Sequence, residues 1–151
     1  MNPKVIGEIK VTVSCVRDCP SPSPLRQPCE VAAFWRKNVE TASWYQDEKE
    51  CCVVFMLDAR NTIKSFNLVS LGTLNTSLVH PREVFRPAVL VGAKSIIIAH
   101  NHPSGDPEPS AEDIDLTKRL LKAGEIMEIE LLDSLVIAGR LHRSMKEQGI
   151  I

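Results

Sequence analysis

The sequence predicts a single layered α/β domain. Three short runs rich in β-branched and apolar residues, at 51–57, 95–99 and 130–138, are typical of strands. Segments with helical spacing or helix-capping residues separate these runs, and strands that alternate with helices indicate a sheet covered by helices. A chain of 151 residues is long enough to bury one hydrophobic core, so we expect no second domain.

The first 28 residues differ in character from the rest. Apolar and polar residues alternate over residues 8–14, which predicts a half-buried strand. Prolines interleaved with serines follow and predict an extended connector without regular structure: Pro20, Pro22, Pro24 and Pro28. We therefore divide the chain into an N-terminal strand and proline-rich connector, residues 1–28, and a single domain, residues 29–151.

A helix and a hairpin are expected next. Residues 30–40 are predicted to form a short amphipathic helix, because their apolar residues recur at helical spacing. The turn-forming residues 58–61 would join the strand at 51–57 to a partner at 62–71. Because the strands at 51–57 and 95–99 are almost continuously apolar, both are expected in the centre of the sheet.

Two further helices are bounded by residues that favour helix ends. Pro81 suits the first turn of a helix that residues 82–91 continue and Gly92 ends, with a kink expected at the proline inside it. Ser110 can cap the other helix, and Gly124 is expected to end it.

The overall charge excludes some classes of partner. The chain has 18 Lys and Arg against 19 Asp and Glu, a formal net charge of −1, so the charge balance does not favour direct binding to nucleic acid. No apolar run reaches the roughly 18 residues of a membrane span, and the N-terminus lacks the apolar core of a signal peptide. We expect a cytoplasmic protein without a membrane partner, whose oligomeric state the sequence leaves open.

The cysteines predict neither a disulfide framework nor a metal site. Their number is odd, and no CxxC pair is present: Cys15, Cys19, Cys29, Cys51 and Cys52. We expect free thiols, of which Cys51 and Cys52 would be small buried hydrophobes.

The strongest chemical signal lies between His100 and Asp113. His100 and His102 stand at the end of a predicted strand, where residues two apart project to the same side. With Asp113 they supply two imidazoles and a carboxylate, a set that leaves one position of a zinc ion open for water, as in catalytic sites. Non-haem iron also uses such a set. Ser110 and Asp113 equally fit a helix-capping box, which is compatible with a metal site.

This spacing resembles that of a known family. His100-x-His102, seven residues, Ser110, two residues and Asp113 resemble the HxHx7SxxD motif of the JAB1/MPN (JAMM) metalloproteases. Further segments resemble the RadC subgroup of bacterial JAB-domain proteins: residues 72–75, 79–83, 98–105 and 131–133. The resemblance spans roughly residues 50–151. It implies a three-layer α/β/α domain of JAB1/MPN-like (cytidine-deaminase-like) fold with a mixed central sheet.

The resemblance also implies roles for individual residues. His100, His102 and Asp113 would bind Zn²⁺, and Ser110 would stabilise the reacting oxygen. A glutamate at the start of an upstream strand would be the general base. Glu50, directly before the strand at 51–57, fits that place best.

Several positions near the motif leave questions open. Glu48 competes with Glu50 for the role of base. Ser134 stands where RadC-like chains commonly have histidine, so any role of that histidine is missing or altered here. Four residues around His102 are expected to shape the loop, without a chemical role: Asn101, Pro103, Ser104 and Gly105.

The implied function is that of a zinc-dependent metallopeptidase acting on a peptide or isopeptide bond of an unidentified peptide or protein. Because RadC-like proteins carry a DNA-repair label, a non-catalytic binding module associated with DNA repair is the alternative. Relatives have a helix-hairpin-helix region before this domain, for which residues 1–50 are too short and proline-rich.

The His-Asn-His letters also suggest a metal-dependent nuclease, but HNH nucleases draw their histidines from separated parts of a ββα unit. A zinc deaminase is excluded, because its H-x-E and P-C-x-x-C signatures are absent.

Overall fold

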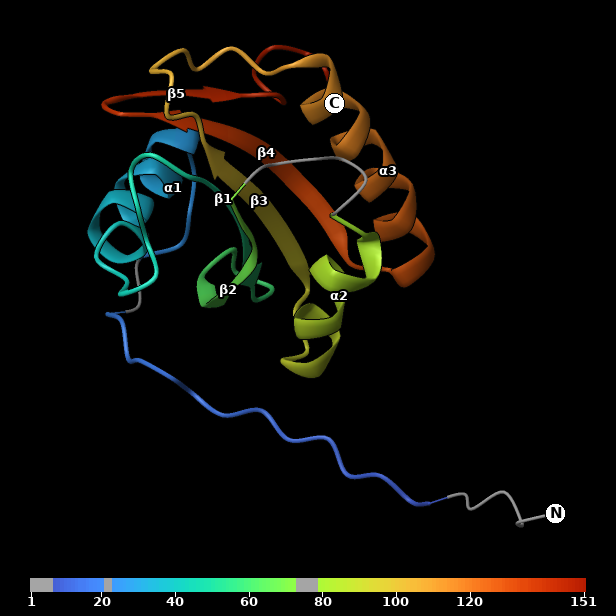
Figure 1. Ribbon diagram of the computed structural model, residues 1–151. Coiled ribbons are helices and arrows are strands. Elements are labelled where there is room, and N and C mark those ends of the chain that lie inside the picture. The colour runs from blue at the N-terminus through green and yellow to red at the C-terminus, as the bar shows by residue number, and fades with distance from the viewer. Residues whose placement is uncertain (1–6, 21–22, 73–78) are drawn as a thin grey trace, which may run out of the picture.

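The computed structural model describes residues 7–20, 23–72 and 79–151 and has a mixed α/β fold (Figure 1). Its elements in chain order are α1 (Pro28–Phe34), the π-helical turn η1 (Trp35–Val39), β1 (Glu50–Leu57), β2 (Ile63–Gly72), α2 (Pro81–Leu90), β3 (Ser95–Asn101), α3 (Ala111–Met127), β4 (Glu130–Ala138) and β5 (Leu141–Ser144). The strands form one five-stranded sheet in the order β2-β1-β3-β4-β5. Only β3 and β4 run parallel, so the sheet is mixed.

Helices cover both faces of this sheet, with α1 and η1 on one side and α2 and α3 on the other (Figure 1). Successive residues of a strand point to opposite faces. Accordingly, Val53 and Phe55 of β1 pack in the layer of α1, whereas Cys52, Val54 and Met56 pack beneath α2 and α3. The predicted three-layer α/β/α fold with a mixed central sheet is confirmed.

Most of the predicted elements form. β1 and β3 are the interior strands expected from their apolar sequences, and β2 pairs with β1 as the expected antiparallel hairpin. The helix predicted over residues 30–40 starts at Pro28 and changes to a π-helical turn at Trp35. All five cysteines are free thiols, and Cys51 and Cys52 are buried.

Two details at the C-terminal end differ from the prediction. Gly124 does not end α3, which continues to Met127 and is capped by Glu128 in the left-handed conformation at φ 54°. A Cβ on Gly124 would lie 2.7 Å from the carbonyl oxygen of Ile129, so this glycine serves close packing inside the helix. The edge strand β5 was not predicted, because its four residues carry no apolar alternation.

The strand predicted over residues 8–14 is wrong for this chain taken alone. Residues 7–14 belong to no strand, and their apolar side chains are exposed. Alternation predicts a strand only if a neighbouring edge accepts its backbone hydrogen bonds, and no described strand does so here. Parts of other predictions lie outside the described residues: 1–6, 21–22 in the connector and 73–75 in the RadC-like segments.

No helix in the described parts of the chain combines the length and the apolar character needed to cross a bilayer.

Candidate metal centre

The two histidines lie where β3 ends. His100 is the penultimate residue of β3, between Cys52 of β1 and Val136 of β4, and its side chain is almost completely buried. The N–H of His102 donates to the carbonyl of Ile137 at 2.8 Å. This bond keeps the backbone extended for one more step, so both rings turn to the same side.

Asp113 reaches the histidines from the first turn of α3. Its N–H donates to Ser110 Oγ at 3.1 Å, and the Ser110 N–H donates to Asp113 Oδ2 at 2.8 Å. These two bonds are the predicted capping box. The cap therefore also fixes the orientation of the Asp113 carboxylate, which is 4 % exposed.

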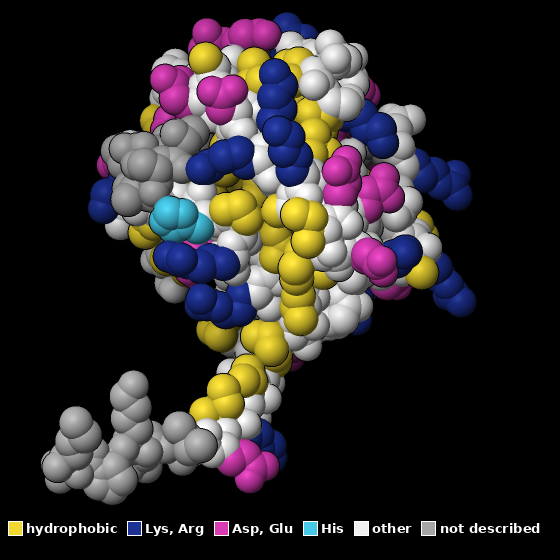
Figure 2. All heavy atoms as spheres, turned by 90° about the vertical axis from the view of Figure 1, so that its right-hand side faces the viewer, with side chains coloured by type: hydrophobic (Ala, Val, Ile, Leu, Met, Phe, Trp, Pro, Cys, Tyr) yellow, Lys and Arg dark blue, Asp and Glu magenta, His cyan; other side chains and the backbone are white. Residues whose placement is uncertain are grey.

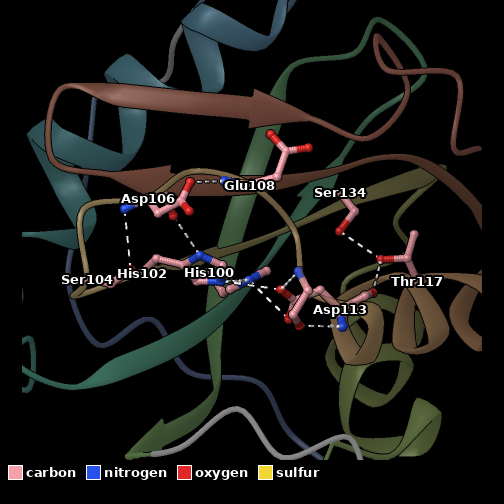
Figure 3. A network of polar contacts seen from close by, with 9 residues as sticks. His100, His102, Ser104, Asp106, Glu108, Asp113, Thr117 and Ser134 are labelled. Atoms are coloured by element: carbon pink, nitrogen blue, oxygen red, sulfur yellow. Dashed lines mark hydrogen bonds and ion pairs between the residues drawn. The ribbon is translucent and has the colours of Figure 1, made fainter.

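The three side chains converge on one point (Figure 3). His100 Nε2 and His102 Nε2 are 3.0 Å apart, and each lies 3.3 Å from an oxygen of Asp113. A tetrahedral ion with bonds of about 2.0–2.1 Å separates its ligand atoms by about 3.3 Å. The predicted ligands thus come together at the spacing of a tetrahedral site, and they form a group that can hold a metal ion.

The charges around the three side chains suit a cation. Burial disfavours the charged carboxylate, but hydrogen bonds from His100 and His102 outweigh burial and hold the pKa of Asp113 below its usual range. The hydrogen bond to Asp113 raises the pKa of His102, against the opposite effect of burial. Asp113 therefore supplies a negative charge at neutral pH.

The loop after β3 orients His102. Its Nδ1 lies 2.8 Å from the carbonyl oxygen of Asp106, which can only accept a hydrogen bond. In the neutral ring the proton therefore sits on Nδ1, and the lone pair of Nε2 is left for a metal. Gly105 permits this turn with a φ of +83°. The Ser104 and Asp106 side chains bond to backbone N–H groups within the loop (Figure 3).

Glu50 lies at the start of β1. Strand alternation puts it on the same face as Cys52, the residue opposite His100. Its charge contributes to the raised pKa of His102. Glu48, the competitor, lies in the exposed turn before the strand. Of the two glutamates, Glu50 is the one on the sheet face of the histidines.

The sequence prediction missed a contact made by Asn101. This side chain is buried and points to the opposite face from His100. Its Oδ1 accepts from the Cys51 N–H at 2.7 Å, and its Nδ2 donates to the Lys49 carbonyl at 2.9 Å. The two bonds hold the backbone on either side of Glu50. The only local sign of this role was the position of Asn101 directly after His100. The hydrogen-bond partners of its side chain lie about fifty residues away in sequence.

Ser134 contributes to a second set of bonds near Asp113. It is buried on β4, and its Oγ lies 3.0 Å from Thr117 Oγ1, which is 2.8 Å from the Asp113 carbonyl oxygen (Figure 3). Because a hydroxyl has one hydrogen, Ser134 donates to Thr117 when Thr117 donates to Asp113. Ser134, which stands where RadC-like chains commonly have histidine, thus supplies a hydroxyl that links the first turns of α3 to the sheet.

Comparison with known proteins identifies the family of this chain. A family model described as the RadC-like JAB domain matches residues 25–150. The chain belongs to the RadC-like JAB domain family. The RadC-like domain is 52 % identical over 101 residues to a UPF0758 protein of Caldanaerobacter subterraneus, covering 67 % of this chain and 43 % of the relative. It is 39 % identical over 150 residues to a UPF0758 protein of Desulfitobacterium hafniense, covering 96 % of this chain and 64 % of the relative.

A third relative, the UPF0758 protein of Methanosarcina acetivorans, is 43 % identical over 106 residues, with 70 % of this chain and 46 % of the relative covered. The RadC-like domain thus spans about half the length of several curated relatives that it matches. The names of these relatives state no activity.

Proposed function

We propose that this domain is a zinc-dependent hydrolase of JAMM type, which cleaves a peptide or isopeptide bond in a peptide or protein substrate. The observation that carries the proposal is the convergence of two imidazoles and a carboxylate at tetrahedral spacing, with Glu50 on the same face of the sheet. Membership of the JAB domain family supports the same chemistry.

His100, His102 and Asp113 would hold the ion. Three protein ligands leave one coordination position for water, which is the arrangement of catalytic zinc sites. When bound, zinc would act as a Lewis acid and make water a better nucleophile at neutral pH. The bond from His102 Nδ1 to the Asp106 carbonyl keeps Nε2 turned towards the ion.

Glu50 would move the proton. In the proposed reaction its carboxylate takes a proton from the attacking water and then gives it to the departing amine. Ser110 would stabilise the negative oxygen that forms on the substrate. Its Oγ acts as an acceptor in the helix cap, so the cap does not use the hydroxyl hydrogen. Loss of such a donor typically costs about 10²–10³ in rate.

Metal analysis of purified variants tests the ligand set. The wild type should contain about one zinc per chain, His100→Ala should lose it, and Glu50→Gln should retain it. His80→Ala is the matched control, because His80 is an exposed histidine outside the group. Zinc retained in His100→Ala at the level of the control would contradict the proposed ligands. Iron in place of zinc would keep the ligands and change the proposed metal.

Activity is tested on libraries of peptides and isopeptide-linked peptides, with the wild type and Glu50→Gln side by side. We expect cleavage that a chelator abolishes and that Glu50→Gln lacks. If zinc is bound but neither library is cleaved, a non-catalytic binding module becomes the better interpretation of this domain's function. Metal-dependent nicking of plasmid DNA would instead favour a nuclease.

A further inference from the structure

The segment 7–14, the N-terminal arm, has no regular secondary structure and pairs with no described strand. Ile9, Val11 and Val13 are 83 %, 60 % and 58 % exposed, and polar residues alternate with them. Among the described residues, no hydrogen bond joins the arm to the rest of the chain. Figures 1 and 2 show the arm extending away from the folded domain, with apolar side chains exposed to solvent. Such alternation is typical of a strand with one buried face.

The root of the arm is attached beside an edge of the sheet. The Arg17 guanidinium donates to the Asn38 carbonyl and to Thr41 Oγ1, and it lies 6.0 Å from the centre of the Phe66 ring. Phe66 belongs to β2, which pairs with β1 on one side and with no described strand on the other. The arm therefore leaves the body next to β2.

The outer edge of β2 suits an additional strand. This strand has ten residues, and its apolar side chains remain partly exposed: Phe66, Leu68, Val69 and Leu71. The opposite edge of the sheet is β5, which has only four residues. An eight-residue strand spans roughly 26 Å, so the ten residues of β2 can pair with the whole arm and the four residues of β5 cannot.

We propose that the arm adds as a sixth strand to the outer edge of β2 in a second copy of this chain, and that the two copies exchange arms. In each copy the arm points away from its own sheet (Figure 1), which places it to reach a neighbouring molecule. Pairing satisfies the backbone N–H and C=O groups of both the arm and β2. It also covers the apolar face of the arm against the partly exposed side chains of β2.

The area of this contact is sufficient for a dimer. Each of the three branched side chains of the arm can bury roughly 100 Å² of apolar surface. Two arms and the two β2 edges that they cover would together bury on the order of 1,200 Å². This value lies at the lower end of the range for specific protein interfaces, so the contact is large enough to hold a dimer.

Sedimentation equilibrium of the full chain tests the proposal with a matched pair of variants. We expect a dimer for the wild type and for Thr12→Asp, which adds a charge to the polar face of the arm. Val11→Asp adds the same charge to the apolar face, twice in each dimer. It should weaken dimerisation by at least roughly 100-fold, since burial of one valine is worth about 1.5 kcal/mol.

A second pair locates the edge. Leu71 of β2 and Leu141 of β5 are both exposed leucines, 42 % and 57 %. Leu71→Asp should dissociate the dimer and Leu141→Asp should not. Hydrogen exchange of the amides at 9–14 should slow with rising concentration of the wild type and stay fast in Val11→Asp, whose body remains folded.

Three results would overturn the proposal. The first is a wild-type monomer at all concentrations, whether its arm exchanges fast or is protected within the monomer. The second is a dimer that Val11→Asp leaves intact. The third is a dimer that depends on Leu141 and not on Leu71. None of these results bears on the metal centre.

Discussion

Replacement of Asn101 by alanine should separate the geometry around Glu50 from metal binding. The Asn101 side chain joins the end of β3 to the backbone of Lys49 and Cys51 through two bonds, of 2.9 and 2.7 Å. Neither bond touches His100, His102 or Asp113. The substitution is therefore expected to loosen the start of β1 and leave the three ligands in place.

The size of the effect follows from the two lost bonds. Each contributes about 1 kcal/mol net, and the buried Cys51 N–H left without an acceptor adds a penalty of about 1 kcal/mol. We expect Asn101→Ala to lower the free energy of unfolding by about 2–4 kcal/mol. For a chain of this length that corresponds to a decrease in Tm of about 6–12 °C.

Urea unfolding and metal analysis together check this prediction. Asn67→Ala is the control, because Asn67 is an exposed asparagine of β2. The control should change the free energy of unfolding by less than about 0.5 kcal/mol, and Asn101→Ala should keep the zinc content of the wild type. An Asn101→Ala protein as stable as the control would refute the reasoning. Loss of zinc in a folded Asn101→Ala protein would show that Asn101 supports the ligands as well.

Two further predictions concern packing and ionisation. Gly124→Ala should destabilise the fold by about 1–2 kcal/mol in urea unfolding, because strain against the Ile129 carbonyl exceeds the gain in helix propensity; a more stable variant would contradict this packing. Burial raises the pKa of Cys51 to about 12 and also raises the pKa of Cys52. In the unfolded chain these thiols ionise near their ordinary pKa of about 8.5, whereas in the folded protein they stay neutral to higher pH. Their contribution to the free energy of unfolding is therefore lost as pH rises above about 8.5. At pH 8 a thiol reagent should leave Cys51 and Cys52, two of the five cysteines, unmodified until the protein unfolds. Rapid reaction of a fourth thiol in the folded protein would contradict this prediction.

The predicted elements that formed are those whose signal is local. The apolar runs of β1, β3 and β4 specify buried strands wherever they lie in a sheet. The capping box at Ser110 is likewise complete within four residues. Where a residue has two compatible roles, local signals are ambiguous. Gly124 has the identity of a helix terminator, but it is needed for close packing within α3.

The arm shows what alternation alone does not decide. Residues 8–14 have the pattern of a strand, yet a strand needs an edge with free backbone groups, and the sequence does not say which edge or which molecule provides it. Only the three-dimensional structure shows that the arm leaves beside β2 and that β2 has an outer side without a described partner.

By itself, the sequence determined the layered α/β class, the interior strands and the identity of the three candidate ligands, because each depends on periodicity or on a short motif. Only the tertiary structure decided their distances, the position of Glu50 on the sheet face of the histidines, and the bonds of Asn101. Those features join residues about fifty positions apart. They depend on the pairing of β1 with β3, and the register of two strands is set by the packing of the whole sheet.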